Sequence, residues 1–301
     1  MRGIGSGVLP SSCPYRALTR LDIHSSATAA PVSMERFVAR SADGERTVLL
    51  SKPLATVEAR PFLAEAEFSR YLLGPWVLPV VDIAAPGGEA WVAHRYVPAL
   101  PLPTVLALHG RPLPERTVKA LAVALVETLA VLHGQNITHA GVSPSSVLIA
   151  TDGPRLTCYG AARAAVPDDV PRREAPGLDS GSLPPEQAAG GKPRPLGDIY
   201  ALGATLAYAA TGYTVPEREE LPSFLRPLVG RCLARDPAQR PSPLEMIEEL
   251  VEGAAPLGSA QIGPATRAGA LLGPGWLPAR VVAGIAHQSA SVLAAELAPA
   301  T

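Results

Sequence analysis

The stretch ITHAGVSPSSVLIA, residues 137–150, lies near the middle of the chain, between a long helical pattern and a pair of strand-like runs. Its last five residues, SVLIA, predict a short apolar strand, and RLTCY at 155–159 predicts a second one. The residues TDGP at 151–154 between these runs are typical of a tight turn. The preceding run, LPERTVKALAVALVETLAVLHG at 113–134, places its leucines on one stripe and predicts a long helix.

The residues before this region are rich in strand signals. RFVARSADGERTVLLSKP (36–53) has an Asp43-Gly44 turn between two strand-like runs, and VLPVVDIA (77–84) and EAWVAHRYV (89–97) flank a Gly-Gly turn. LAEAEFSRYLL (63–73) has helical periodicity. These patterns predict a small, strand-rich unit that contains one helix.

The residues after position 159 are rich in helix signals instead. A segment with many prolines and glycines runs from 166 to 195, and DIYALGATLAYAATG (198–212) then predicts a helix too apolar to lie on a surface. LPSFLRPLVGRCLARD (221–236) and SPLEMIEELV (242–251) predict two further helices. LPARVVAGIAHQSASVLAAEL (277–297) predicts a last, amphipathic helix, which we expect to dock on its own large unit or on a partner.

Composition excludes several classes of protein. The chain has 301 residues and a formal net charge of −1, so nothing suggests a nucleic-acid partner. Three widely separated cysteines suggest neither a zinc site nor a disulfide framework. The first residues lack the apolar run of a signal peptide, and we see no apolar stretch of the ~18 residues needed to span a bilayer. We therefore expect a cytoplasmic protein without a membrane span.

Seven segments, in order, resemble those of the bacterial serine/threonine protein kinases of the actinobacterial type. Together they cover roughly residues 15–252. The segments are the region around Glu65 for helix C, HRYVPALPL (94–102) for the hinge, the 137–150 loop, RLTCYGAAR (155–163), GSLPPEQAAG (181–190), GDIYALG (197–203) and CLARDPAQRPS (232–242).

The resemblance implies an α+β, two-lobed protein-kinase-like fold, with a small β-rich N-lobe and a larger, mostly helical C-lobe. We expect a flexible leader at 1–14, the N-lobe at 15–97 and the C-lobe at 98–252. A linker at 253–275 and the amphipathic helix at 276–298 follow. Only the eight residues YTVPEREE (213–220) stand where the family carries helix G, so that region is shortened.

The positions that carry kinase chemistry in the family are changed in this chain. Gly141 replaces the aspartate that accepts the substrate proton, and Ser143 replaces the lysine that follows it. Ser146 and Cys158 replace the asparagine and aspartate that hold magnesium. A thiol is a soft ligand, whereas magnesium prefers hard oxygen ligands. No catalytic position therefore stands intact.

The small lobe departs from the family in a similar way. No glycine occurs between positions 8 and 43, where a glycine-rich loop would cover the phosphates. The strand lysine falls on Ser51 or, after a one-residue slip, on Lys52. In the second register Lys52 could pair with Glu65. The small residue above the adenine becomes Leu49 or Leu50, which should fill space that the base needs.

At the hinge, His94 stands at the gatekeeper position, and Arg95 and Val97 follow it. We interpret these three residues, together with Leu49 and Leu50, as residues that occlude the cleft or form the hinge.

The positions that hold the family's fold together are retained. His139 matches the family's histidine that ties the catalytic loop down, and Asp198 matches the aspartate that braces the backbone of that loop. Gly160 is also in place, and Glu186 and Arg240 match the ion pair that anchors the activation segment to the large lobe.

The loss of the catalytic positions and the retention of the structural ones favour a pseudokinase, which is a regulatory scaffold and not an enzyme. We expect it to bind neither ATP nor magnesium. We expect a protein partner, such as an active kinase. Two alternatives stay open. The chain is a divergent serine/threonine kinase that uses Lys52, Glu65 and an acidic residue from 168–179, or it is a nucleotide-sensing module without catalysis.

Overall fold

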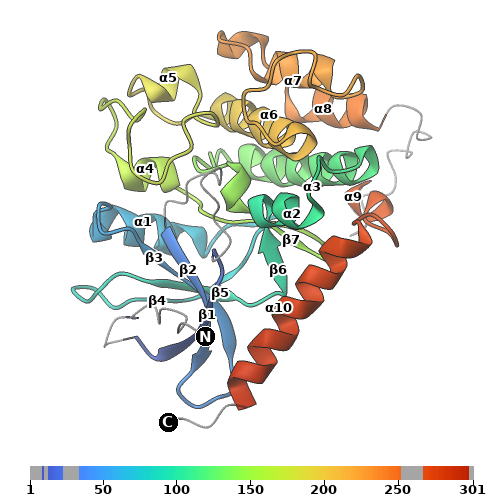
Figure 1. Cartoon of the computed structure of the whole chain (residues 1–301). Helices are drawn as coiled ribbons and strands as arrows, with labels where there is room; N and C mark the ends of the chain where they lie inside the picture. Colours follow the sequence, from blue (N-terminus) through green and yellow to red (C-terminus); the bar gives the residue numbers. More distant parts are fainter. Residues whose placement is uncertain (1–8, 10–12, 23–33, 252–266, 298–301) are drawn as a thin grey trace.

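The computed structural model describes residues 9, 13–22, 34–251 and 267–297, which form two lobes and a long C-terminal helix (Figure 1). The small lobe is a five-stranded antiparallel sheet with helix α1 (Ala59–Ser69) packed beside it. Its strands, in the spatial order β1-β2-β3-β5-β4, are β1 (Tyr15–Arg20), β2 (Met34–Ser41), β3 (Thr47–Pro53), β5 (Val92–Arg95) and β4 (Val80–Ile83).

The hairpin between β2 and β3 sets the register of this sheet. Gly44 has a φ of +79°, which a glycine adopts without strain. The Asp43 carboxylate accepts hydrogen bonds from the Ser41 hydroxyl at 2.5 Å and from the Glu45 amide at 3.0 Å. With this turn, Arg36 lies opposite Ser51 and Glu35 opposite Lys52.

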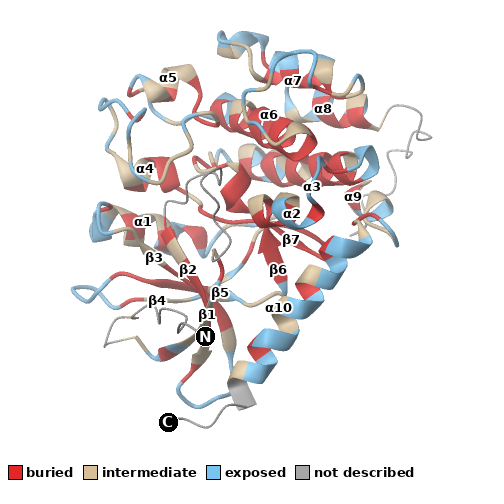
Figure 2. Cartoon of the chain, in the orientation of Figure 1, coloured by how far each residue is buried: buried red, intermediate tan, exposed pale blue. Residues whose placement is uncertain are grey.

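The large lobe surrounds the apolar helices α3 (Glu115–Gly134) and α6 (Pro195–Thr211), which Figure 2 shows to be largely buried. A three-stranded sheet in the order β6-β7-β8 lies at the border between the lobes. The other elements of this lobe are β6 (Ala99–Pro101), α2 (Leu102–His109), η1 (Pro144–Ser146), β7 (Val147–Ala150), β8 (Gly153–Leu156), α4 (Ala161–Ala165), α5 (Pro185–Ala188), α7 (Arg226–Cys232), η2 (Pro237–Gln239) and α8 (Pro243–Leu250).

Helix α3 bears on the expectation that no segment of the chain is apolar and long enough to span a membrane. Among the described residues it is the one helix that is long and apolar enough to cross a bilayer, with a mean hydropathy of 1.5. However, 67% of that window is buried inside the fold, as expected for the core helix of a packed domain. A cytoplasmic location stays a prediction.

The C-terminal region packs on the same chain. Helix α10 (Ala279–Leu297) contacts α2 and β6 of the large lobe and β1 of the small lobe, so it runs along both lobes (Figure 1). Trp276, just before it, is buried and donates from its indole nitrogen to the Thr151 carbonyl at 2.7 Å. The predicted linker at 253–275 overlaps the short helix α9 (Arg267–Leu271), and most of its remainder lies outside the described residues. The same holds for most of the leader at 1–14.

Several predicted boundaries differ from the observed ones. Helix α1 begins at Ala59 and ends at Ser69, about four residues before the predicted span at both ends. Helix α2 was not predicted, because its start carries Pro101 and Pro103, yet proline is tolerated in the first helical turn. No helix occurs at 213–220.

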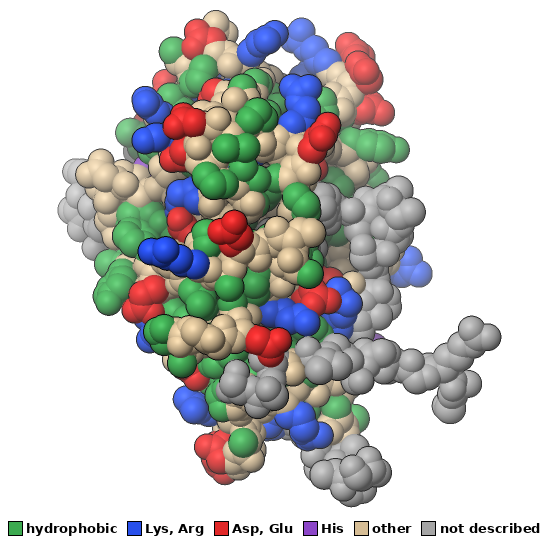
Figure 3. Space-filling view, turned by 90° about the vertical axis from the view of Figure 1, so that its left-hand side faces the viewer, with side chains coloured by type: hydrophobic (Ala, Val, Ile, Leu, Met, Phe, Trp, Pro, Cys, Tyr) green, Lys and Arg blue, Asp and Glu red, His purple; other side chains and the backbone are tan. Residues whose placement is uncertain are grey.

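Charge of both signs is spread over one face of the molecule. On the face shown in Figure 3, basic and acidic side chains are interspersed rather than gathered into an area of one sign. This distribution agrees with the formal net charge of −1.

Candidate functional site

The loop 137–146 is held by a buried carboxylate of helix α6. Asp198 accepts hydrogen bonds from the backbone amides of His139 at 2.7 Å and Ala140 at 2.8 Å, and lies 3.0 Å from Nε2 of His133. Ala140 has a φ of +54°, a left-handed conformation that is strained for a residue with a side chain. Asp198 therefore fixes a loop backbone that would not adopt this shape by itself.

Gly141 lies where the loop meets the Cys158–Tyr159 turn. A Cβ atom at position 141 would lie 2.0 Å from the carbonyl oxygen of Cys158 and 3.1 Å from Cβ of Ala161. Cys158 itself has a φ of +61°. The packing of this turn therefore leaves no room for a side chain at position 141, and glycine also supplies no group that could act as a base.

Ser143 and Ser146 use their hydroxyl groups locally. The Ser146 hydroxyl accepts from the Ser143 amide and donates to the Ser143 carbonyl, both at 2.8 Å, and so caps the turn η1. The Cys158 thiol is buried, 3.5 Å from the Thr157 hydroxyl. These two positions do not fit magnesium, since one hydroxyl is already bonded and a thiol is a soft ligand.

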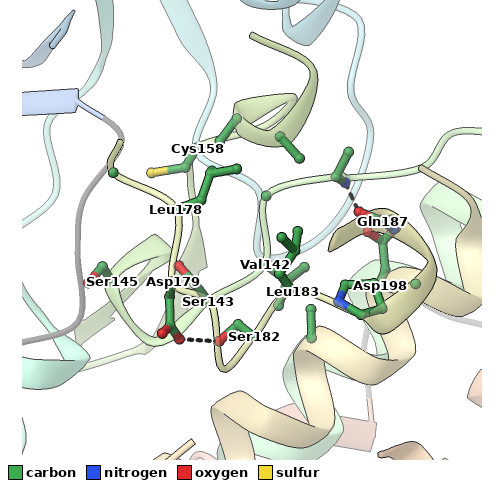
Figure 4. A pocket seen from close by; sticks show the side chains of 18 residues that line it. Val142, Ser143, Ser145, Cys158, Leu178, Asp179, Ser182, Leu183, Gln187 and Asp198 are labelled. Carbon is green, nitrogen blue, oxygen red and sulfur yellow. Dashed lines mark hydrogen bonds between the residues drawn. The ribbon is translucent and has the colours of Figure 1, made fainter. Parts of the chain in front are cut away.

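A small pocket lies between this loop and the activation segment, here residues 158–187. The loop contributes Gly141, Ser143 and Ser145 to its wall, and the activation segment contributes Leu178 and Asp179, among others (Figure 4). Asp179 accepts a hydrogen bond from the Ser182 hydroxyl at 2.5 Å and from the Gly181 amide at 3.2 Å. The pocket thus holds a carboxylate that already binds a serine hydroxyl.

The pairing of β2 with β3 decides between the two registers left open by the sequence. Ser51 is buried and lies opposite Arg36, which contacts the catalytic loop, so Ser51 is the residue on the face toward the large lobe. Lys52 points to the other face and pairs with Glu35, with Nζ 2.9 Å from its carboxylate.

The predicted Lys52–Glu65 pair is therefore wrong. Glu65 is bound instead by Arg163, whose Nε and Nη2 donate to the two carboxylate oxygens at 2.7 Å each. The same carboxylate lies over Gly160, where a Cβ would come within 2.2 Å of an oxygen. Helix α1 is thus tied to the activation segment and not to the β3 strand.

Hydrocarbon fills the part of the cleft next to the hinge. Leu49 belongs to one buried cluster with Leu21, Leu78, Ala99, Leu148 and Ala150, and Val97 packs against it. Leu50 does not line the cleft, contrary to the alternative prediction, because it packs on the opposite face with Phe37 and Trp91. Arg95 is exposed beside this cluster.

A second small pocket lies behind His94. Its wall includes Phe62, Val92, His94, His139 and Tyr159. His94 bonds through Nδ1 to the Leu78 carbonyl at 3.2 Å, and His139 packs edge-on against the Tyr159 ring. Burial lowers the pKa of both histidines from 6.5 to about 4, so both are neutral at pH 7.

These histidines predict a loss of stability in acid. Above pH 6.5 they are neutral in both states; between pH 6.5 and 4 the unfolded chain takes up protons that the folded protein does not. We expect the free energy of unfolding to fall by on the order of 2 kcal/mol per histidine at pH 5, measured by urea denaturation. His94→Leu should flatten this slope, while the exposed His287→Gln should not. Equal slopes in all three proteins would contradict the prediction.

The activation segment is anchored to the large lobe at its far end. Arg240 is buried and donates from Nη1 and Nη2 to the two oxygens of Glu186, at 2.7 and 2.9 Å. It also donates to the carbonyls of Ala234 and Leu196. This bidentate arrangement is the strongest geometry for such a pair.

Two residues of the site were not singled out from the sequence. Arg36 is fully buried on β2 and reaches the catalytic loop, and Asp179 was included only as one of the acidic residues of 168–179. The one available signal for Arg36 was a charged residue within the strand-like run that starts at position 36.

Comparison with known proteins relates the chain to kinases of actinobacteria. Serine/threonine-protein kinase AfsK of Streptomyces coelicolor is 30% identical over 268 residues, which cover 82% of this chain and 32% of AfsK. Probable serine/threonine-protein kinase PkwA of Thermomonospora curvata is 32% identical over 261 residues, covering 79% of this chain and 34% of PkwA. The chain therefore spans about a third of the length of these relatives. No family model matches it.

A solved structure shows the same fold. The PknI kinase domain of Mycobacterium tuberculosis superposes with a TM-score of 0.59 at 21% identity, covering 83% of this chain and 99% of that domain. The predicted two-lobed α+β kinase fold is thereby confirmed.

The comparisons also correct one expectation. We expected a domain that is not an enzyme and takes neither ATP nor magnesium. That expectation is overturned, because the relatives that match most of the chain are named serine/threonine-protein kinases, a class of enzyme that uses ATP and magnesium. The chain is a protein-kinase-like domain of the actinobacterial serine/threonine kinase family.

Proposed function

We propose that the domain is a divergent serine/threonine protein kinase that transfers phosphate from ATP to a protein hydroxyl. The observation that carries this proposal is the relationship to AfsK and PkwA over about four fifths of the chain. The retained frame of the large lobe supports it, because Asp198 and the Glu186–Arg240 pair hold the catalytic loop and activation segment in place. The protein partner expected from the sequence, such as an active kinase, stays a prediction.

In this proposal, Asp179 takes the role that Gly141 cannot perform. Its carboxylate lies in the pocket beside the catalytic loop and accepts a hydrogen bond from the Ser182 hydroxyl at 2.5 Å. A substrate serine needs the same contact to lose its proton during transfer. Ser182 would have to yield this position to the substrate hydroxyl.

In the proposed reaction, the one step assigned to a side chain of this pocket is the acceptance of the substrate proton. The substrate oxygen attacks the terminal phosphorus of ATP, and its proton passes to Asp179, while ADP leaves. We assign no magnesium ligand, because Ser146 and Cys158 do not fit that ion.

The test is phosphate transfer from radiolabelled ATP to the protein itself and to basic protein substrates, followed by identification of the phosphorylated residue. We expect phosphoserine or phosphothreonine, and a loss of at least about 10²-fold in rate for Asp179→Asn. Asp169→Asn is the matched control, since Asp169 lies exposed on the same segment.

Two results would count against the proposal. Incorporation by the wild-type protein no higher than by a heat-denatured sample would refute kinase activity. A rate for Asp179→Asn equal to that of the Asp169→Asn control would leave the kinase but remove Asp179 as its base.

A further inference from the structure

Arg36 is a charged residue in a position where charge is costly. It is 0% exposed and, with Arg172, one of the two largest fully buried side chains among the described residues. It lies on β2 opposite Ser51, so the two side chains share the sheet face toward the large lobe. Ser51 stands where the family carries its phosphate-binding lysine, and a hydroxyl supplies no positive charge there.

The guanidinium of Arg36 joins three parts of the cleft. Nε and Nη2 donate to the two carboxylate oxygens of Asp22, at 3.1 and 2.5 Å, and Nη1 donates to the Ser145 carbonyl in the catalytic loop at 2.8 Å. Burial lowers the pKa of Arg36, but the nearby Asp22 carboxylate and Cys158 together raise it by more, so the pKa lies above its usual value. Arg36 is therefore always charged in the fold.

Two other cations near the cleft are engaged elsewhere. Lys52 pairs with Glu35 on the opposite sheet face, and Arg163 pairs with Glu65 of α1. Within the part of the chain that the structure describes, Arg36 is thus the cation that joins the sheet to the catalytic loop. Its planar fork of N–H groups binds a carboxylate and a phosphate with the same geometry.

We propose that Arg36 is the phosphate-binding residue of the cleft, and that Asp22 occupies it as an internal anion until the phosphates of a nucleotide replace the carboxylate. The proposal rests on the proposed function, because it takes ATP as the substrate. In this assignment the positive charge lies on β2, whereas the family carries it on the neighbouring strand, here β3. In this proposal the Asp22 carboxylate weakens nucleotide binding, because it competes with the phosphates for Arg36.

This assignment predicts opposite effects for the two members of one ion pair. Asp22→Asn keeps the shape of the side chain but removes the competing charge, so ATP and inorganic tripolyphosphate should bind about tenfold more tightly, with adenosine unchanged. Arg36→Gln should abolish the preference for ATP over adenosine, and Arg36→Lys should restore part of it. An ion pair with a purely structural role would instead make both substitutions weaken binding.

The experiment is calorimetric titration of the full chain with adenosine, ATP and tripolyphosphate. Glu35→Gln is the matched control, because it breaks the Lys52 pair on the other sheet face. If Arg36→Gln does not fold, the affinities of Asp22→Asn and wild type for ATP and tripolyphosphate still test the proposal. Weaker or unchanged phosphate binding in Asp22→Asn would overturn the proposal, as would a wild-type protein that binds ATP no better than adenosine.

These titrations, read together with the radiolabelled transfer assay described above, separate this inference from the proposed function. Tighter tripolyphosphate binding by Asp22→Asn without any phosphate transfer would remove the kinase activity and keep Arg36 as the phosphate ligand. Phosphate transfer by a protein whose ATP affinity does not respond to Asp22 or Arg36 would keep the kinase and remove this assignment.

Discussion

Gly141→Asp, which restores the residue that kinases carry at this position, is expected to destabilise the domain rather than to supply a base. The Cβ position follows from the backbone and no rotamer can move it, so it must come within 2.0 Å of the Cys158 carbonyl oxygen unless the turn shifts. The turn is already constrained, since both Ala140 and Cys158 have positive φ angles.

The expected loss in the free energy of unfolding is roughly 3 kcal/mol or more, the upper range for overpacking a buried site. Urea denaturation measures it. Gly134→Ala is the matched control, because no atom lies within 4 Å of a Cβ placed there and the residue ends helix α3. Control and wild type should agree within about 1 kcal/mol. A Gly141→Asp protein of wild-type stability with a raised transfer rate would contradict this prediction, because the turn would then accept the side chain and a carboxylate at this position would serve as a base in the variant.

Asp198→Ala is the second substitution with a large expected effect. It leaves the buried amides of His139 and Ala140 without their acceptor and removes the contact with His133. Each unsatisfied buried donor costs about 1–3 kcal/mol, so we expect a loss of roughly 3–5 kcal/mol in stability. Ala140 would then be free to leave its strained conformation, and the catalytic loop would lose its shape.

Two further variants calibrate that result in the same urea denaturation experiment. Asp198→Asn retains one oxygen acceptor and should lie between wild type and Asp198→Ala. Asp236→Ala removes only the side-chain cap of the exposed turn η2, where the Ala238 amide bonds to the carboxylate at 3.0 Å. It should cost about 1 kcal/mol. If Asp198→Ala is no more destabilising than Asp236→Ala, Asp198 does not hold the loop.

The absence of the usual catalytic residues was read from the sequence one position at a time. That reading led to an inactive scaffold, which the named kinase relatives overturn. A charge that is lost at one position can be supplied from a neighbouring element, and sequence spacing alone does not reveal such an exchange. Arg36 on β2 and Asp179 on the activation segment lie where an exchange of this kind would be needed.

The sequence by itself determined the fold. The hairpin around Asp43-Gly44, the apolar helix at 198–212 and the order of the seven kinase-like segments predicted two lobes, because hydrophobic periodicity and turn residues act locally. Glu186, Asp198 and Arg240 were also identifiable, since each lies in a segment with a recognisable pattern.

Only the tertiary structure decided how the cleft is arranged. Whether Ser51 or Lys52 faces the large lobe depends on a register in which a slip of one residue exchanges the two faces. Likewise, Glu65 pairs with Arg163, 98 positions away, and Arg36 reaches a carbonyl 109 positions away. Such partners are set by packing between lobes, and no local pattern in the chain encodes them.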